Sequence, residues 1–188
     1  MGTAGNFSMR SPENLSRYWV TASGLDKGQL QAQDFIHLAD DLDKVDPSDP
    51  RKPSDEALIH ELIYQQFPEV QVVYHVHPPC GTWVSRQYPE AIGSIPLPKI
   101  EMMKGLGIPS HESEASVLLI PNHQSMPILC EWIQNLAEQT PLPVLMIQGH
   151  GLYAWGNTPQ AAKRHVEISE FLFQQRQWDL IQKGACDA

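Results

Sequence analysis

Short apolar runs recur along the chain, and each is bounded by Gly, Pro or small polar residues. The runs contain many β-branched and aromatic side chains, a combination that is typical of β-strands. We therefore predict six strands, over residues 5–10, 17–21, 70–77, 115–120, 144–148 and 152–155.

Three other segments place apolar residues at helical spacing. Ser54 is suited to cap a first helix, whose first turn carries Glu56. Residues 124–139 give a weaker second pattern, and a third begins with Thr158 as cap and Pro159 in the first helical position. The predicted apolar faces contain Leu58, Leu62 and Ile63 in the first helix, Ile128, Trp132, Ile133 and Leu136 in the second, and Ala162, Val166, Ser169, Leu172 and Phe173 in the third.

The mixture of strands and helices predicts an α/β, or layered α+β, architecture. The chain of 188 residues is suited to a single domain over residues 1–188, and its 41% of hydrophobic residues is enough for a sizeable core. The segment 44–55 is rich in Pro and charge, which indicates a surface loop. The order of the strands does not follow from these patterns.

Charge and cysteine content exclude several classes of protein. The formal net charge is −9, unlike the basic surface of a nucleic-acid or anionic-membrane binder, although a local metal ion can still attract an anionic small molecule. The three cysteines include no C-x-x-C pair, so neither a disulfide framework nor a cysteine zinc site is indicated. Without a signal-peptide pattern or a long apolar run, we expect a soluble cytoplasmic protein.

His75 and His77 lie one residue apart in the sequence VVYHVHPPC, inside a predicted strand. Alternate residues of a strand face the same side, so the two imidazoles face one way. They can then converge on one divalent metal ion. The alternative is two buried histidines with separate hydrogen-bond partners, and we favour the metal interpretation.

A catalytic metal site usually has three protein ligands and one open position. We favour His150 as the third ligand, because it follows the apolar run VLMIQ and lies between two glycines that permit close backbone approach. His111 and His123, in polar loops, are the alternatives. Cys80 is a conceivable sulfur ligand, but the preceding Pro-Pro pair predicts that the strand has already turned. The other histidines, predicted to be structural or exposed residues of helices, are His37, His60 and His165.

A general acid/base is also needed near such a metal. Glu101 lies in the apolar sequence PKIEMMKG, where burial would raise its pKa, and Glu56 lies in the first turn of the first predicted helix. The residues alone do not decide between them. Three small-residue loops can in addition hold an anion through backbone N–H groups and hydroxyls; they contain Gly5 and Asn6 with Ser8, Ser23 with Gly24, and Ser54.

In order along the chain, the segments GNFS, TASG, PSDE, H-x-H and a distant H-G resemble the class II aldolase/adducin family. The resemblance extends from Gly2 to about Phe173. It implies a sheet flanked by helices on both sides, a homotetramer with sites near subunit interfaces, and one Zn²⁺ per subunit held by His75, His77 and His150. It further implies a sugar-phosphate substrate, with Asn6, Ser23, Gly24 and Ser54 at phosphate-binding positions.

The segments TASGLDKG, IEMMKG and HGLYAWGNTPQAAKRHVEISEFL are similar to those of family members that remove water from a ketose phosphate in methionine salvage. In those members the position of Glu101 holds the acid/base. The alternatives are a sugar-phosphate aldolase or a pentulose-phosphate epimerase, which would use Glu56, and a non-catalytic scaffold like the adducin head. Relatives usually carry an N-terminal helix before the GTAGN loop, and we expect that helix to be missing here.

Overall fold

The computed structural model describes residues 4–186 and contains an eight-stranded sheet. The strands lie in the order β3-β2-β1-β4-β8-β7-β6-β5. Neighbouring strands are antiparallel, except that β6 and β7 are parallel. The strands are β1 (Asn6–Arg10), β2 (Tyr18–Thr21), β3 (Phe35–Leu38), β4 (Val72–Val76), β5 (Gly93–Pro96), β6 (Ser116–Ile120), β7 (Val144–Ile147) and β8 (Gly151–Gly156).

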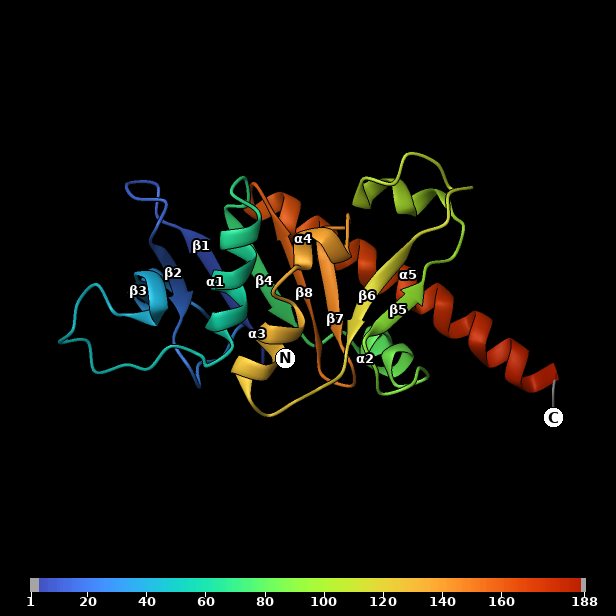
Figure 1. The fold of residues 1–188 in the computed structure, drawn as a ribbon, viewed down its shortest axis with the longest axis horizontal. Coiled ribbons are helices and arrows are strands. Elements are labelled where there is room, and N and C mark those ends of the chain that lie inside the picture. The colour runs from blue at the N-terminus through green and yellow to red at the C-terminus, as the bar shows by residue number, and fades with distance from the viewer. Residues whose placement is uncertain (1–3, 187–188) are drawn as a thin grey trace.

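Helices cover both faces of this sheet, as predicted (Figure 1). One apolar core lies between the sheet and α1 (Ala57–Gln66), α3 (Met126–Trp132) and α4 (Leu136–Gln139). A second lies on the other face, under α2 (Pro79–Ser85), η3 (Glu101–Leu106) and α5 (Pro159–Cys186). Two further 3₁₀ turns are η1 (Ala32–Asp34) and η2 (Asp40–Leu42).

The central strands are apolar along their whole length because both of their faces are covered. All residues of β7 and β8 are buried, which explains why β7 shows a continuous apolar run and not an alternating pattern. β4 lies between β1 and β8 at the middle of the sheet. His75, near the end of β4, is therefore paired with Asn6 of β1 on one side and Tyr153 of β8 on the other.

All six predicted strands are present, but two strands were not predicted. These are β3 and β5, which are short and form the two edges of the sheet. Edge strands pack on one side only, so their sequence pattern is weak. His37 accordingly lies in β3 and not in a helix, and its ring stacks on Trp19 at a centroid distance of 4.1 Å.

The predicted helix over residues 124–139 is interrupted. It forms α3 and α4, separated by a turn, and the side chain of Gln66 spans the interruption. The Gln66 amide donates to the carbonyl of Ile133 and accepts from the backbone N–H of Ala137, each at 3.0 Å. The break therefore persists because a side chain of α1 satisfies backbone groups that a continuous helix would have paired.

The ends of α1 and α5 differ in how well they were predicted. Thr158 caps α5 through its hydroxyl, which accepts from the N–H of Ala161 at 3.1 Å, as predicted. Ser54 does not cap α1: that helix begins at Ala57, after a turn in which the Ser54 hydroxyl accepts from the N–H of Glu56 at 3.3 Å. The α1 face that meets the sheet contains Ile59, His60, Ile63 and Tyr64, while Leu58 and Leu62 are only half-buried.

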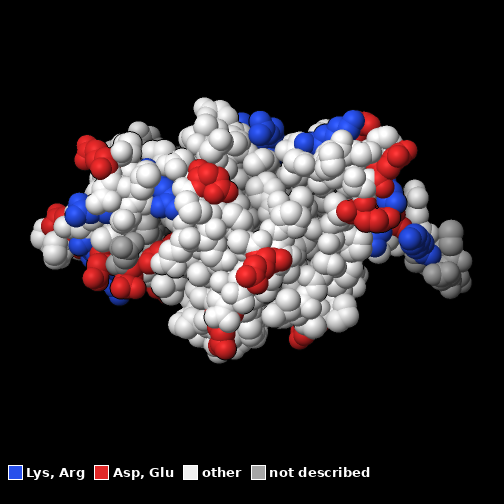
Figure 2. Space-filling model, turned by 45° about the horizontal axis from the view of Figure 1, so that its top comes forward, with Lys and Arg blue, Asp and Glu red and all other residues white. Residues whose placement is uncertain are grey.

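Charged side chains gather at both ends of the molecule in the view of Figure 2, with few between them. Lys and Arg are mixed with Asp and Glu there, and no continuous basic patch crosses this face. Among residues 4–186, no helix is both long and apolar enough to cross a membrane. The resemblance begins at Gly2, and residues 1–3 lie outside the described part of the chain. The expectation that the helix before the GTAGN loop is missing therefore stays a prediction.

Candidate metal centre

Most of the polar residues that the sequence singled out lie along one side of the sheet, where several strands end; this side, and not an outermost strand, is the edge meant below. β4, β6 and β7 run in the same direction, so their carboxyl ends meet at this edge, at the bottom of Figure 1. β1 and β8 run in the opposite direction and begin there. The edge therefore brings together His75 and His77 at the end of β4, His150 after β7, and Asn6 at the start of β1.

His75, His77 and His150 form a group whose ligand nitrogens all lie within 4.8 Å of one another. The Nε2 atoms of His75 and His77 are 3.0 Å apart. Among the side chains that the structure describes, it is the one cluster of three histidine, cysteine or acidic residues close enough to hold a metal ion. His111 and His123, the alternative third ligands, are outside it, and so is Cys80.

The glycines around His150 make this convergence possible. Gly149 has φ of +63°, in the left-handed region that favours glycine. A Cβ on Gly151 would lie 2.6 Å from Cε1 of His75 and 2.8 Å from Cδ2 of His77. A larger residue at position 151 would clash with both rings and with the carbonyl oxygen of Val76.

Burial favours the neutral, metal-binding form of His75. His75 is fully buried, and this burial lowers its pKa to about 3. Its Nδ1 lies 3.2 Å from the carbonyl oxygen of Leu152, which fixes the ring and directs Nε2 toward the cluster. The ring also stacks on Tyr153, with centroids 4.2 Å apart. A cluster of three imidazoles fits the donor set that Zn²⁺ takes in catalytic sites.

Glu56 joins the cluster from the turn before α1. Its Oε1 lies 3.0 Å from Nε2 of His150 and 3.6 Å from Nε2 of His75, and Asn6 donates a hydrogen bond to its Oε2. Burial alone would raise the pKa of this carboxyl group. The hydrogen bonds from His150 and Asn6, with the field of the histidines, outweigh burial and lower the pKa to about 2. Glu56 is therefore a carboxylate directed at the metal-binding nitrogens.

A cavity of about 590 Å³ opens over the cluster. Ser23 and Ser54 line it beside Glu56, His77 and His150. The cavity is also lined by Asn122, Gln124 and Met126, which the sequence did not single out, and by His123, which it offered only as an alternative metal ligand. These residues directly follow the apolar strand β6. Their place beside His150 could be predicted only if β6 were known to run parallel to β7.

The remaining residues of the predicted anion loops are placed differently. Asn6 is almost fully buried and donates to the hydroxyl of Ser54 at 3.2 Å, so it supports the cavity wall from behind. Gly5 has φ of +82°, and a Cβ there would lie 2.5 Å from the carbonyl oxygen of His75. Gly24 is exposed at the end of β2, with φ of +80°. Ser8 points into the core, where its hydroxyl lies 2.6 Å from Nδ1 of His60.

Glu101 lies at the opposite edge of the sheet. β5 runs antiparallel to β6, so the chain after β5 enters η3 at the edge where β6 begins, at the top right of Figure 1. The sequence left open whether this carboxyl group is buried with a raised pKa or faces solvent, and in the structure it faces solvent. The Glu101 side chain is 65% exposed, and hydrogen bonding to Lys104 (2.7 Å), with a contribution from His111 (2.6 Å), lowers its pKa. Within one chain, Glu101 is not part of the histidine cavity.

Comparison with known proteins identifies the family of this chain. The profile of the class II aldolase and adducin N-terminal domain matches residues 1–176. The chain belongs to the class II aldolase and adducin family. It is 38% identical over 171 residues to the methylthioribulose-1-phosphate dehydratase of Xanthomonas campestris pv. campestris, covering 90% of this chain and 76% of that protein. The Yersinia pseudotuberculosis protein of the same name is 39% identical over 174 residues, covering 92% and 76%.

Solved structures confirm the class II aldolase fold. An L-fuculose 1-phosphate aldolase superposes with a TM-score of 0.76 at 21% identity, covering 97% of this chain and 77% of that one. The L-fuculose-1-phosphate aldolase of Thermus thermophilus gives a TM-score of 0.69 at 20% identity, covering 98% and 88%. At these identities the comparison supports the architecture alone.

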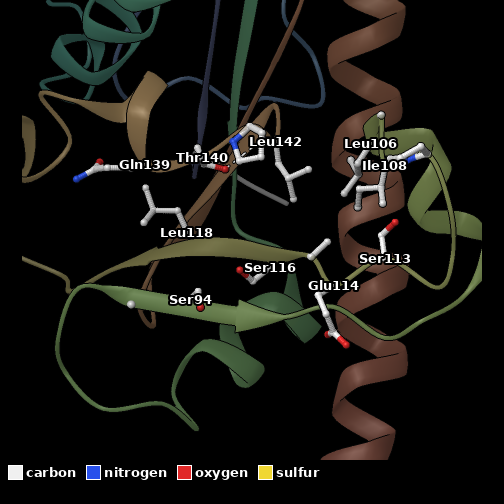
Figure 3. Close-up of a pocket in the computed structure, with 15 residues that line it drawn as sticks. Ser94, Leu106, Ile108, Ser113, Glu114, Ser116, Leu118, Gln139, Thr140 and Leu142 are labelled. Carbon is white, nitrogen blue, oxygen red and sulfur yellow. Dashed lines mark hydrogen bonds between the residues drawn. The ribbon is translucent and has the colours of Figure 1, made fainter.

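This family member has a second cavity, of about 660 Å³, between β6, the segment after η3 and the segment before β7 (Figure 3). Leu106, Ile108, Leu118 and Leu142 point into it, with Thr140 and Ser116 between them. It is larger than the histidine cavity, but its lining has no histidine or cysteine and one acidic residue, Glu114. The chemistry therefore locates the candidate active site in the smaller cavity.

Proposed function

We propose that this protein is a zinc-dependent dehydratase that converts 5-methylthioribulose 1-phosphate to 2,3-diketo-5-methylthiopentyl 1-phosphate and water, in methionine salvage. The observation that carries the proposal is the combination of two findings. Relatives named methylthioribulose-1-phosphate dehydratase match about nine-tenths of the chain, and a three-histidine cluster with a carboxylate lies in a cavity of substrate size.

The metal would be held by His75, His77 and His150. Of the ions that imidazoles bind, Zn²⁺ is suited to three neutral histidines with an open position, and Fe²⁺, Co²⁺ and Mn²⁺ are alternatives. When bound, such a cation supplies Lewis-acid polarisation of the oxygen atoms of a carbonyl and a neighbouring hydroxyl. The fixed ring of His75 and the glycine beside His150 support this assignment, because both hold the nitrogens in place before a metal arrives.

The reaction requires a base and an acid. The C3–H bond breaks, its proton goes to a base, and the C4–O bond breaks as the hydroxyl group takes up a proton and leaves as water. The resulting enol at C3 becomes the second ketone when C4 gains a proton and the C3 hydroxyl loses one, so the net change is the loss of one water. Carboxylates positioned beside the reacting carbons can serve each proton transfer.

We assign this acid/base role to Glu101 and a role beside the reacting atoms to Glu56. Because Glu101 lies at the opposite edge of its own sheet, it can serve a histidine cavity only from a neighbouring subunit. The proposal therefore includes a homotetramer in which the exposed η3 of one subunit faces the cavity of another. The exposure of the Glu101 side chain, 65%, supports this arrangement, since a residue that works at an interface must be accessible on the isolated chain.

The substrate phosphate is assigned to the loops at the other side of the cavity. Ser23 and Ser54 line it directly, and Gly24 adjoins Ser23 with an open, left-handed backbone that can approach an anion closely. Asn6 and Gly5 complete this assignment by holding Ser54 and the end of β4 in position.

The second candidate is a sugar-phosphate aldolase or pentulose-phosphate epimerase of the same family. One observation favours it: Glu56, the carboxylate such an enzyme would use, is in the cavity, whereas Glu101 of the same chain is not. The intact histidine cluster argues against the non-catalytic alternative, a scaffold like the adducin head.

Phosphorus and proton NMR time courses test the proposal. Zinc-loaded protein is mixed with 5-methylthioribulose 1-phosphate, and a Glu101→Gln variant is measured beside it. Formation of the diketo phosphate, with loss of that activity in the variant, is the expected result. Release of dihydroxyacetone phosphate would establish the aldolase. Unchanged substrate in folded, metal-loaded protein would contradict the dehydratase proposal.

A further inference from the structure

Glu170 of α5 binds the beginning of α2. Its two carboxylate oxygens accept hydrogen bonds from the backbone N–H groups of Cys80, at 3.0 Å, and Gly81, at 3.1 Å. The first N–H groups of a helix have no partner within it, and a carboxylate suits the positive end of the helix dipole. Glu170 therefore fastens α2 to α5.

Only two residues separate this attachment from His77. They are Pro78 and Pro79, whose rings fix φ and leave the connection little freedom. The carbonyl of Pro78 also accepts from the N–H of Thr82 at 2.9 Å, so the connection is continuous with the helix. A displacement of α2 is thus transmitted to the backbone of His77.

Gly81 allows α2 to pack closely against α5. A Cβ at this position would lie 2.8 Å from Cδ2 of Phe173. Two contacts with α5 thus hold the beginning of α2, the close approach at Gly81 and the hydrogen bonds to Glu170, while its far end at Ser85 is bonded to Gln148 and Gly149.

The backbone and ring of His77 have fewer fixed contacts than those of His75. β4 ends at Val76, so no strand pairing holds His77, whereas His75 is paired with Asn6 on one side and Tyr153 on the other. His75 also has a second ring contact, with the carbonyl of Leu152. For His77, the ring hydrogen bond found within the described residues is the one to His75 itself.

We propose that Glu170 is a positioning residue of the metal centre, which sets the place of His77 by fastening α2 to α5. This inference rests on the proposed metal function of the histidine cluster. The same carboxylate acts on Cys80: burial and then the negative charge of Glu170 raise the pKa of this thiol to about 11. Part of this rise comes from Glu170, so loss of its charge is expected to lower the pKa of the thiol.

The test compares full-length Glu170→Gln and Glu170→Asp with Glu167→Gln. Glu167 lies on the same helix with its side chain 63% exposed, and it pairs with Lys163 at 3.5 Å, so it controls for the loss of a charge on α5. Co²⁺ affinity is measured by competition with a chelator, together with the visible Co²⁺ spectrum, at a temperature where every variant is fully folded. Thermal unfolding of the metal-free proteins and the rate of Cys80 alkylation are measured in parallel.

We expect both Glu170 variants to bind Co²⁺ roughly tenfold more weakly, with an altered spectrum, and Glu167→Gln to bind it normally. Alkylation of Cys80 is expected to be faster in Glu170→Gln. An unchanged affinity and spectrum in the Glu170 variants overturn the proposal even if they unfold at a lower temperature, because a purely structural cap affects stability alone. Glu170→Asp keeps the test decisive if the amide variant does not fold. Failure of the unaltered protein to bind Co²⁺ through its histidines would instead contradict the metal centre, and this inference with it.

Discussion

Oε1 of Glu56 lies 3.0 Å from Nε2 of His150, a nitrogen that the metal centre would use. The carboxylate therefore faces the position where a metal-bound substrate would react, and its pKa, lowered to about 2, keeps it ionised at neutral pH. A carboxylate in this place can accept a proton from a carbon atom beside the metal. It also balances part of the positive charge of the site.

Replacement of Glu56 by Gln is expected to lower turnover by roughly 100-fold to 10,000-fold, because it removes the ionised group beside the reacting atoms that assists the proton transfers assigned to Glu101. The three histidines remain, so the protein should still bind about one metal ion per chain. Steady-state kinetics and metal analysis of the same samples check both statements. Glu69→Gln, at an exposed position after α1, is the matched control. Turnover equal to that of the control would exclude Glu56 from the reaction.

His150→Ala is expected to lose bound metal, and Cys80→Ser is expected to keep it. The nitrogens of His75, His77 and His150 lie within 4.8 Å of one another, whereas Cys80 belongs to α2 and its raised thiol pKa disfavours coordination. Metal content after dialysis distinguishes the two variants. Metal loss from the cysteine variant alone would show that the third ligand is the sulfur atom.

The sequence was sufficient for the parts of the site that depend on local pattern. Two histidines at strand spacing in a buried run, and a histidine between glycines after another buried run, are informative because burial and backbone freedom restrict what these residues can do. The family resemblance then supplied the sheet with helices on both faces. These predictions needed no knowledge of how distant segments pair.

The parts that depend on strand direction could not be predicted. Glu101 resembles a buried carboxylate in sequence, but β5 runs antiparallel to β6 and delivers it to the far edge of the sheet. Asn122 and Gln124 look like ordinary loop residues until β6 is seen to run parallel to β7, which brings them to the cavity. Long-range pairing decides both cases, and β5 gave no strand signal at all.

Activity is expected to return when two inactive variants share one assembly. If Glu101 serves the cavity of a neighbouring subunit, coexpression of Glu101→Gln with His150→Ala should restore about one quarter of the normal activity, since random mixing leaves that share of sites complete. Dehydratase assays of the purified mixed assembly measure this. Coexpression of His75→Ala with His150→Ala is the control, because no site then regains all its ligands. Absence of recovery in a verified mixed assembly would contradict the assignment of Glu101 to a neighbouring site.

Stability at mildly acidic pH is expected to depend on His60. This histidine of α1 is fully buried, its Nδ1 lies 2.6 Å from the hydroxyl of Ser8, and burial lowers its pKa to about 3. The unfolded chain takes up a proton near pH 6.5 and the folded chain does not, so the stabilising contribution is complete above pH 6.5. As the pH falls from there toward 3, it decreases by about 1.4 kcal/mol per pH unit.

His60→Leu removes this titrating group and leaves Ser8 hydrogen-bonded to the hydroxyl of Tyr64, at 2.7 Å. We expect the variant to lose less stability than the unaltered protein between pH 7 and pH 5.5. Urea unfolding of the metal-free proteins at both pH values measures the difference, and the other buried histidines contribute equally to both. His111→Gln, at an exposed histidine, should behave like the unaltered protein. Equal losses of stability in the unaltered protein and His60→Leu would mean that His60 is not the group whose burial makes the fold acid-sensitive.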